Sequence, residues 1–182
     1  MESLRGHLLI ASPAIHDPHF RQTVVLLAEH TQDGAMGVIL NRVTEAMVGE
    51  TIPDLAALTG AGASVHVGGP VGEEGITVLA RFHEPERAAL LVHEDVGFIA
   101  AGDEDPAALA DAVDRARIFV GHAGWGPGQL EEELDEESWI VGQPELEDLF
   151  SADPTGLWAH VLRRMGGAYA LVATMPADPS SN

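Results

Sequence analysis

The feature that most constrains the fold is a glycine-rich segment, residues 121–128, which joins an expected strand to an expected helix. The strand is the apolar run 118–120. The helix is expected from Leu130 and Leu134, four residues apart, with Pro127 just ahead of them. Glycines at this density let a backbone turn sharply or approach another group closely. We therefore expect either a binding site or a tight packing corner here.

Apolar runs predict most of the other strands. Residues 7–11, 23–28 and 36–40 are nearly continuous apolar runs, typical of strands that are covered on both faces, and the last two are expected to form a hairpin. Between the first two runs, Phe20 is expected to pin a proline-containing loop to the core. Further strands are expected over residues 64–67, 76–80, 89–92 and 138–141.

Capping residues mark the expected helices. Asp105 and Asp153 each precede a proline and a helically spaced apolar pattern, which predicts helices over residues 105–116 and 153–165. Shorter helices are expected over residues 51–58 and 144–150, an irregular segment over 43–50 and a turn over 73–75. Strands outnumber helices and some are closely joined. The pattern therefore predicts a mixed α/β class, with helices packed on a mixed sheet.

Composition limits the classes of function. The 182 residues and 46% hydrophobic content suit one folded domain. We place that domain over 1–182, with an ordered core over about 4–176 and a polar tail over 177–182. With 29 acidic and 9 basic residues the net charge is −20, which repels nucleic-acid phosphates, so we expect no direct nucleic-acid binding.

Two residue types are absent. Without cysteine the chain has no disulfide, thiolate nucleophile or cysteine-bound metal, and without lysine it has no Schiff base or phosphate-loop lysine. The apolar run near the start, residues 8–11, is shorter than the core of a signal peptide, and no stretch has eighteen uninterrupted apolar residues. We expect a cytoplasmic protein that does not enter a membrane.

A series of ordered motifs resembles the AlgH/YqgE family. They are GHLLIASP (6–13), DPHF (17–20), TVVLLAEH (23–30), GAMGVILNR (34–42), GGPV (68–71), GHAGW (121–125) and GQLE (128–131). Trp139, the helix around residues 158–166 and the ending 178–182 also resemble the family's closing segments. Val43 departs from the pattern, which has a proline there, and His16 and His19 are not part of it.

The resemblance implies a compact α/β domain built on a strongly bent mixed sheet that approaches a pseudo-barrel, with flanking helices. The family is largely uncharacterised, and it is described as a transcriptional regulator through one member linked to alginate control. With so large a negative charge, any effect of this chain on transcription is expected to be indirect.

The candidate site is a cleft for a ligand or a protein partner near the glycine-rich segment. Its predicted residues are Asp17, Arg21, His30, Asn41, Gly124, Trp125, Gly128 and Gln129. Trp125 and Gln129 are the best candidates for ligand contacts. The alternative is that His30 and Asn41 end their strands by bonding to loop backbone, and that the glycines serve packing or self-capping, which we favour over an anion site.

Metal binding and catalysis have little support. The HDPH sequence at 16–19 offers imidazole and carboxylate groups but no third ligand, and the acidic run after Leu130 lacks a calcium-loop pattern, so we expect no metal and no cofactor. No standard catalytic motif is present. A binding regulator is therefore preferred. An enzyme using a cleft near His30, Asn41, Trp125 and Gln129, or a structural interaction protein, remains an alternative, as monomer or homodimer.

Overall fold

The structure is a computed structural model that describes residues 2–99, 102 and 104–177. These residues form two compact units. Unit 1 comprises residues 2–42 and 123–177, and unit 2 comprises the described residues between 43 and 122. The single domain over 1–182 stays a prediction. Of the expected polar tail, residues 178–182 lie outside the described part of the chain.

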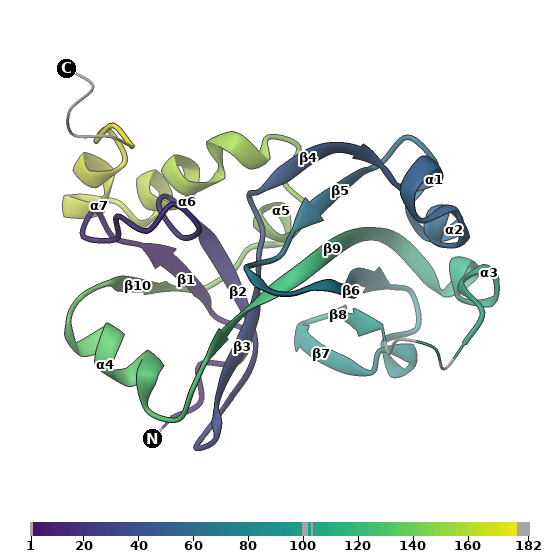
Figure 1. Cartoon of the computed structure of the whole chain (residues 1–182), viewed down its shortest axis with the longest axis horizontal. Coiled ribbons are helices and arrows are strands. Elements are labelled where there is room, and N and C mark those ends of the chain that lie inside the picture. The colour runs from purple at the N-terminus through teal and green to yellow at the C-terminus, as the bar shows by residue number, and fades with distance from the viewer. Residues whose placement is uncertain (1, 100–101, 103, 178–182) are drawn as a thin grey trace. The chain divides into compact units, whose positions relative to one another are not determined.

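Unit 1 contains an antiparallel sheet with the strand order β10-β1-β2-β3-β9 (Figure 1). The strands are β1 (Leu8–Ala11), β2 (Val24–Thr31), β3 (Gly34–Ile39), β10 (Trp139–Gly142) and residues 123–125 of β9 (Val113–Trp125). The helices are α4 (Gln129–Asp135), α5 (Leu146–Leu149), α6 (Leu157–Met165) and α7 (Gly167–Val172), with a 3-10 turn at Pro154–Gly156.

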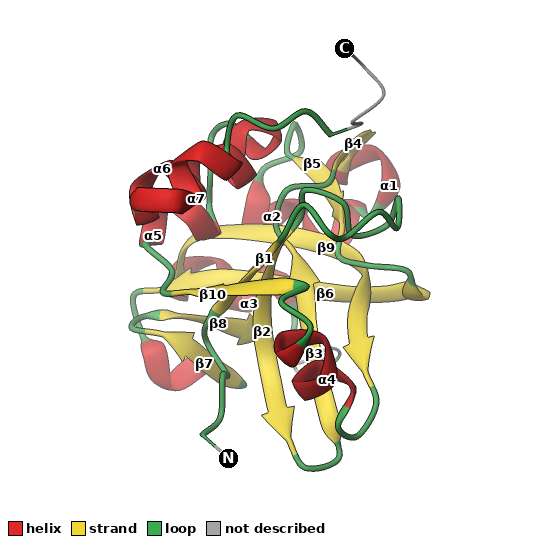
Figure 2. Ribbon diagram, turned by 90° about the vertical axis from the view of Figure 1, so that its left-hand side faces the viewer, coloured by secondary structure: helices red, strands yellow, loops and turns green. Residues whose placement is uncertain are grey.

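Both faces of the central strands in unit 1 are covered, as the continuous apolar runs predict. Leu9 and Leu27 pack with Leu130 of α4 on one face. On the other face Ile10 is also fully buried, and the Trp158 indole of α6 donates a hydrogen bond to the Ala11 carbonyl at 2.8 Å. Figure 2 shows α4 and the α6–α7 pair on opposite sides of β1 and β10.

Unit 2 has the strand order β4-β5-β9-β6-β8-β7, in which only the β5–β9 pair is parallel among the described strands. The strands are β4 (Val43–Met47), β5 (Ser64–Val67), β6 (Val71–Phe82), β7 (Leu90–His93), β8 (Val96–Ile99) and residues 113–122 of β9. Helices α1 (Val48–Thr51), α2 (Ala56–Thr59) and α3 (Pro106–Leu109) and the 3-10 turns Pro53–Leu55, Pro85–Arg87 and Ala110–Ala112 complete it. Phe82 and Ile118 are buried in its core.

The predicted mixed α/β class is confirmed, and several element boundaries are corrected. The segment 43–50, expected to be irregular, forms β4 and α1; β4 is mostly exposed and carries no apolar alternation that could reveal it. The expected turn at 73–75 lies within β6. The helix after Asp105 ends at Leu109 and a 3-10 turn follows, because the chain enters β9 at Val113. Strand β8 and helix α7 were not predicted.

The expected end of the strand at residue 120 is also wrong, because β9 continues through the glycines to Trp125. Gly121 lies in the strand at φ +70°, where a Cβ would be 2.3 Å from the Gly69 carbonyl oxygen. This glycine therefore serves close backbone packing within unit 2. No helix in the described ranges is long and apolar enough to cross a bilayer.

Candidate functional site

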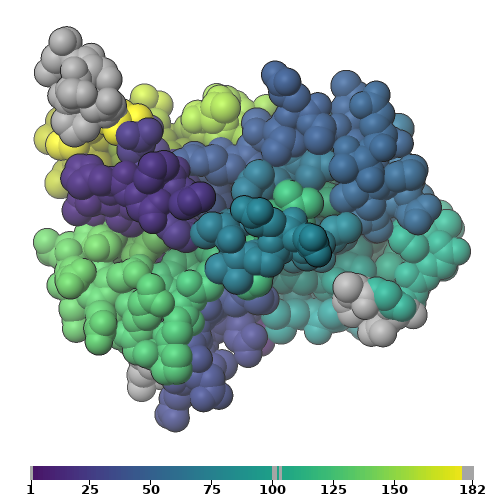
Figure 3. Space-filling model, in the orientation of Figure 1, coloured from purple at the N-terminus to yellow at the C-terminus, as the bar shows by residue number. Residues whose placement is uncertain are grey.

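A pocket of about 360 Å³ in unit 1, here called the tryptophan pocket, lies beside α4. Its lining includes the side chains of Asp17, Phe20, Trp125, Gln129, Glu133 and Trp139. Residues 14–20 form one wall, and the end of β9, α4 and the start of β10 form the other. Figure 3 shows the purple surface of the first segment beside the green surface of α4.

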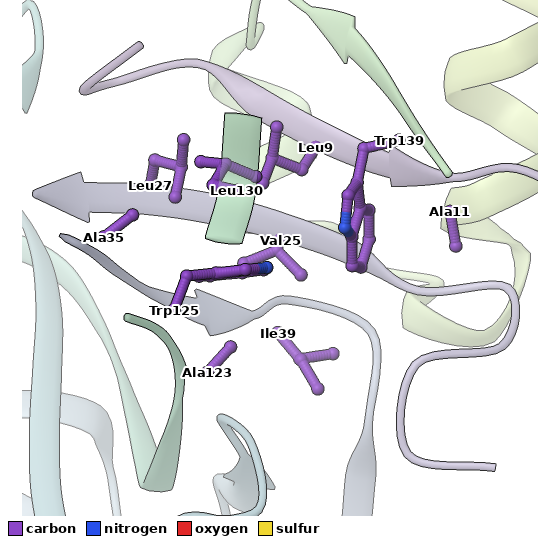
Figure 4. Close-up of a cluster of buried hydrophobic side chains, with 10 residues drawn as sticks. All are labelled: Leu9, Ala11, Val25, Leu27, Ala35, Ile39, Ala123, Trp125, Leu130 and Trp139. Atoms are coloured by element: carbon purple, nitrogen blue, oxygen red, sulfur yellow. The ribbon is translucent and has the colours of Figure 1, made fainter. Parts of the chain in front are cut away.

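Three aromatic rings meet at this pocket. The ring centroids of Trp125 and Trp139 are 5.9 Å apart at 76°, and those of Phe20 and Trp139 are 5.8 Å apart at 84°. Phe20 lies 6.3 Å from Trp125, at 38°. The two edge-to-face pairs, both of which include Trp139, stabilise the cluster beyond simple burial. Figure 4 shows the two indoles within the hydrophobic cluster of unit 1. The expected role of Phe20 in pinning its loop is confirmed.

One carboxylate holds both indoles in place. Glu133 Oε2 accepts hydrogen bonds from Trp125 Nε1 at 2.9 Å and from Trp139 Nε1 at 2.8 Å. Its other oxygen, Oε1, accepts one from Gln129 Nε2 at 2.9 Å, across one turn of α4. Because all three donors are neutral, they orient the carboxylate without cancelling its charge. Among the ion pairs of the described residues, none involves Glu133.

The first turn of α4 is capped by the side chain of Gln129, the first residue of the helix. Gln129 Oε1 accepts a hydrogen bond from the Gly126 N–H at 3.0 Å, and its amide nitrogen donates to Glu133. Gly128, at the N-cap, has φ +76°, a left-handed conformation that favours glycine, and a Cβ there would meet open space. Gly128 therefore shapes the turn rather than the pocket. The arrangement matches the self-capping interpretation.

The mouth of the pocket is acidic. Asp17 and Glu136 line it and are exposed, and His16 is the one imidazole among its lining residues. Asp17 Oδ1 also accepts a hydrogen bond from the His19 N–H at 2.8 Å, which helps to fix the loop. Of the predicted site residues, Asp17, Gly124, Trp125 and Gln129 lie together at this pocket.

His30 and Asn41 do not line the pocket and instead bond to neighbouring strands and loops. Irregular pairing of β2 with β3 between Leu27 and Glu29 lets His30 point inward, where it is 7% exposed. Its Nδ1 accepts the Leu4 N–H at 2.9 Å, and its Nε2 lies 2.7 Å from Glu131 Oε1. The hydrogen bond from His30 lowers the pKa of Glu131.

The Asn41 side chain, like that of His30, is held by two hydrogen bonds. Its Oδ1 accepts the Val24 N–H at 2.9 Å, and its Nδ2 donates to the Gln22 carbonyl at 2.8 Å. Gln22 has φ +53°, so this bond helps to fix a strained turn before β2. For both His30 and Asn41, the structural interpretation made from the sequence is confirmed.

Arg21 faces a different cavity of unit 1. It lines a mostly apolar pocket of about 160 Å³ together with His16, Trp158 and Met175. The Arg21 carbonyl accepts a hydrogen bond from the Arg42 guanidinium. Burial, together with the positive charge of Arg21, lowers the pKa of Arg42. The structure therefore separates Arg21 from the tryptophan pocket.

Sequence reasoning missed Glu133, and it treated Phe20 and Trp139 as structural. A signal was present, because Glu133 lies four residues after Gln129, on the same face of α4. The sequence does not show that β10 places the Trp139 indole within hydrogen-bonding distance of the Glu133 carboxylate. Within the described ranges, no group of three or more histidine, aspartate or glutamate residues is placed to hold a metal ion.

The tryptophan pocket combines buried aromatic rings with a few fixed polar groups. Rigid aromatic walls and a few fixed polar groups are typical of small-molecule sites, and the volume is near the lower end of their range. The pocket offers an uncompensated carboxylate, an exposed amide and two exposed carboxylates at its mouth.

Comparisons with known proteins agree on one family. A family model described as AlgH-like matches residues 8–170. A UPF0301 protein of Streptomyces coelicolor is 46% identical, with 100% of this chain and 97% of that protein covered, and one of Thermobifida fusca is 40% identical, with 99% and 96% covered.

Two solved structures are also similar. The crystal structure of protein DIP2367 from Corynebacterium diphtheriae has a TM-score of 0.86 at 25% identity, covering 96% of this chain and 94% of that one. The solution structure of the AlgH protein from Pseudomonas aeruginosa has a TM-score of 0.74 at 28% identity, covering 96% and 95%.

Proposed function

Because the chain belongs to the AlgH-like family, we propose that it is a non-enzymatic regulator that binds a small ligand in the tryptophan pocket. The observation that carries this proposal is the joint fixation of Trp125 and Trp139 by Glu133. Fixed rings lose little conformational entropy when a ligand packs against them. A ligand that bridges α4 and the loop 14–20 would stabilise their arrangement, which a protein partner could then recognise.

A binding role is favoured over catalysis by the hydrogen bonds of His30 and Glu133. Both ring nitrogens of His30 are engaged in hydrogen bonds, so neither is free to take a proton from a substrate. Glu133 already accepts three hydrogen bonds, so most of its acceptor positions are used in holding the two indoles and Gln129. Such hydrogen bonds suit residues that fix the structure around the pocket more than residues that exchange protons with a substrate.

Any effect on transcription would be indirect. The net charge of −20 opposes DNA. Of the paired arginines on α6, Arg164 is engaged with the buried carboxylate of Asp148, which leaves Arg163 as the exposed member. We expect the pure protein to show no tight binding to a defined DNA duplex at physiological salt. Tight binding under those conditions would refute the indirect role.

Ligand binding is tested by comparing the mass of the gently purified protein under native and under denaturing conditions. A bound metabolite adds mass that is lost on unfolding. The variant Glu136→Trp places a large side chain at the pocket mouth, whereas Asp135→Trp adds the same bulk at an exposed neighbour on α4 that does not line the pocket. Both variants remove one negative charge.

We expect the added mass in the wild type and in Asp135→Trp, and its loss in Glu136→Trp. An adduct that is retained in Glu136→Trp would place the ligand elsewhere. A bare chain in every sample, after purification from cells and after incubation with a metabolite extract, would count against ligand binding and favour a protein partner as the direct contact.

A further inference from the structure

A second cavity of unit 1, here called the Arg21 cavity, has a positive charge in its wall and no negative one. It has a volume of about 160 Å³, and Ser12, Arg21, Trp158 and Met175 are among its mostly apolar lining. Figure 1 shows the loop between β1 and β2, which supplies Ser12 and Arg21, next to α7. Although the chain has 29 acidic residues, none of the described residues that line this cavity is an aspartate or a glutamate. Such a wall attracts an anion.

The Arg21 guanidinium has no carboxylate partner among the described residues. The ion pairs that these residues form include neither Arg21 nor its neighbour Arg42. Other arginines do pair with carboxylates, namely Arg81, Arg87, Arg115 and Arg164. Burial and the charge of Arg21 lower the pKa of Arg42, so the two cations repel each other. A bound anion would offset this repulsion.

The cavity also contains a buried hydroxyl that can donate a hydrogen bond. Ser12 is only 9% exposed, and its Oγ accepts the Ala14 N–H at 3.3 Å. Across the described part of the chain, the Ser12 hydroxyl donates to no other group. The side-chain amide of Gln22, which also lines the cavity, is already used, because it donates to the Met175 carbonyl at 3.2 Å. Arg21 and Ser12 therefore bring donors without acceptors to one cavity.

The backbone at Arg21 is fixed before any ligand binds. Gln22 has φ +53°, and Asn41 Nδ2 donates to its carbonyl at 2.8 Å. The Arg42 guanidinium donates to the Arg21 carbonyl. Because these bonds hold the main chain, a ligand of Arg21 would have to order only its side chain, which lowers the entropic cost of binding.

The size and charge of the cavity limit the kind of anion. A cavity of about 150 Å³ holds one benzene molecule. The Arg21 cavity, at about 160 Å³, therefore has room for one apolar group of that size. A single guanidinium matches one planar carboxylate through two parallel hydrogen bonds. The net charge of −20 disfavours anions that carry more than one charge.

We infer that the Arg21 cavity binds a small monocarboxylate whose apolar body is about the size of a benzene ring. The carboxylate accepts hydrogen bonds from the Arg21 guanidinium and the Ser12 hydroxyl, and the apolar body packs against Trp158 and Met175. The lining includes exposed residues, Met175 among them, so a ligand can enter from solvent. This site goes beyond the proposed function and does not depend on it, because neither indole of the tryptophan pocket lines the Arg21 cavity.

The test uses benzoate as the probe and the indole N–H signals of the three tryptophans as reporters, in a two-dimensional ¹⁵N–¹H NMR spectrum of the full chain. Benzamide is the second titrant, since it has the same ring and a planar head without the charge. Trp158 lines the Arg21 cavity, whereas Trp125 and Trp139 line the tryptophan pocket and serve as internal controls. Sodium chloride controls for ionic strength.

We expect benzoate to shift the Trp158 signal saturably and to shift those of Trp125 and Trp139 much less. Benzamide should bind about tenfold more weakly or less, because it cannot form the charge-assisted hydrogen bonds. This comparison is made in the wild-type protein, so it does not depend on the folding of any variant.

The variant Arg21→Gln should weaken benzoate binding about tenfold, since it removes the guanidinium but keeps the backbone carbonyl that Arg42 contacts. Its matched control is Arg163→Gln, which makes the same change at an exposed position of α6 outside the cavity. The control should change the affinity by less than about twofold.

Four results would overturn the inference. Equal affinity for benzamide would show that the cavity selects shape and not charge. An equal loss in Arg21→Gln and Arg163→Gln would assign the effect to the general field of the protein. Saturable shifts confined to Trp125 and Trp139 would place benzoate in the tryptophan pocket. If benzoate moves none of the three signals, the ligand class is wrong, and the proposed function is still judged separately by the mass measurement.

Discussion

The imidazole of His30 lies between a backbone N–H and a carboxylate, with Nε2 placed 2.7 Å from Glu131 Oε1. Since Nδ1 accepts the N–H of Leu4, the proton must be on Nε2, which donates to Glu131. This arrangement links the N-terminal segment to α4 through one buried ring. It also leaves His30 without a free ring nitrogen that could act as a base.

His30→Ala is expected to destabilise the protein by about 2–3 kcal/mol, because the Leu4 N–H loses its buried acceptor and Glu131 its donor. Urea unfolding monitored by fluorescence measures this change. The control is His160→Ala, at an exposed position of α6, which should change stability by less than about 0.5 kcal/mol. Similar effects of the two substitutions would argue against a structural role for His30.

Glu133→Ala should cost about 2–3 kcal/mol of folding free energy, since two indole N–H groups lose a charged acceptor at once. Thermal and urea unfolding would report it. Glu132→Ala, one residue away and exposed, is expected to change stability by less than about 0.5 kcal/mol. If Glu133→Ala is as stable as Glu132→Ala, the hydrogen bonds from the tryptophans contribute nothing measurable.

His66 makes unit 2 sensitive to acid. It is 4% exposed on β5, and burial together with the positive charge of Arg117 lowers its pKa from 6.5 to about 4. Between these two pH values the unfolded chain binds a proton that the folded chain does not. The free energy of unfolding is therefore highest above pH 6.5 and falls as the pH drops towards 4, by about 3 kcal/mol at most.

The measurement is urea unfolding of the wild type and of His66→Leu across this pH range. Other titrating groups contribute equally to both proteins, so the difference between their pH profiles isolates His66. We expect the wild type to lose more stability than His66→Leu as the pH falls. Parallel profiles would contradict the prediction.

Arg164 and Asp148 form the ion pair that ties α6 to α5. The guanidinium donates to both carboxylate oxygens, at 2.6 and 2.7 Å, and Asp148 is 1% exposed. Arg164→Ala should cost about 3 kcal/mol because it leaves a buried carboxylate without its cation. The adjacent Arg163→Ala, at an exposed position, should cost less than about 0.5 kcal/mol. Equal thermal midpoints for the two variants would refute this.

Much of unit 1 could be predicted from the sequence because its signals are local. The continuous apolar runs of β1 and β2 require cover on both faces, and the structure supplies it. Helix caps were equally predictable, in unit 2 as well as in unit 1. Asp105 accepts the Ala107 N–H at 3.0 Å, and Asp153 accepts the Gly156 N–H at 3.1 Å, as their Asp-Pro sequences indicate.

The candidate site was predictable only in part. Trp125 and Gln129 were identified because they stand in the glycine-rich segment, and both line the tryptophan pocket. His30 and Asn41 were grouped with them, since polar residues at the ends of neighbouring strands can converge. The hydrogen bonds that instead hold these two side chains depend on partners far away in the sequence, which no local pattern reveals.

The sequence by itself therefore determined which segments are buried and where several helices begin, because burial and capping depend on residues a few positions apart. The tertiary structure alone decided that β9 continues through its glycines, because strand pairing is a property of two chain segments. It also decided that Glu133 joins Trp125 to Trp139. That relationship needs β10 to fold back against α4, and it turns three separate side chains into one site.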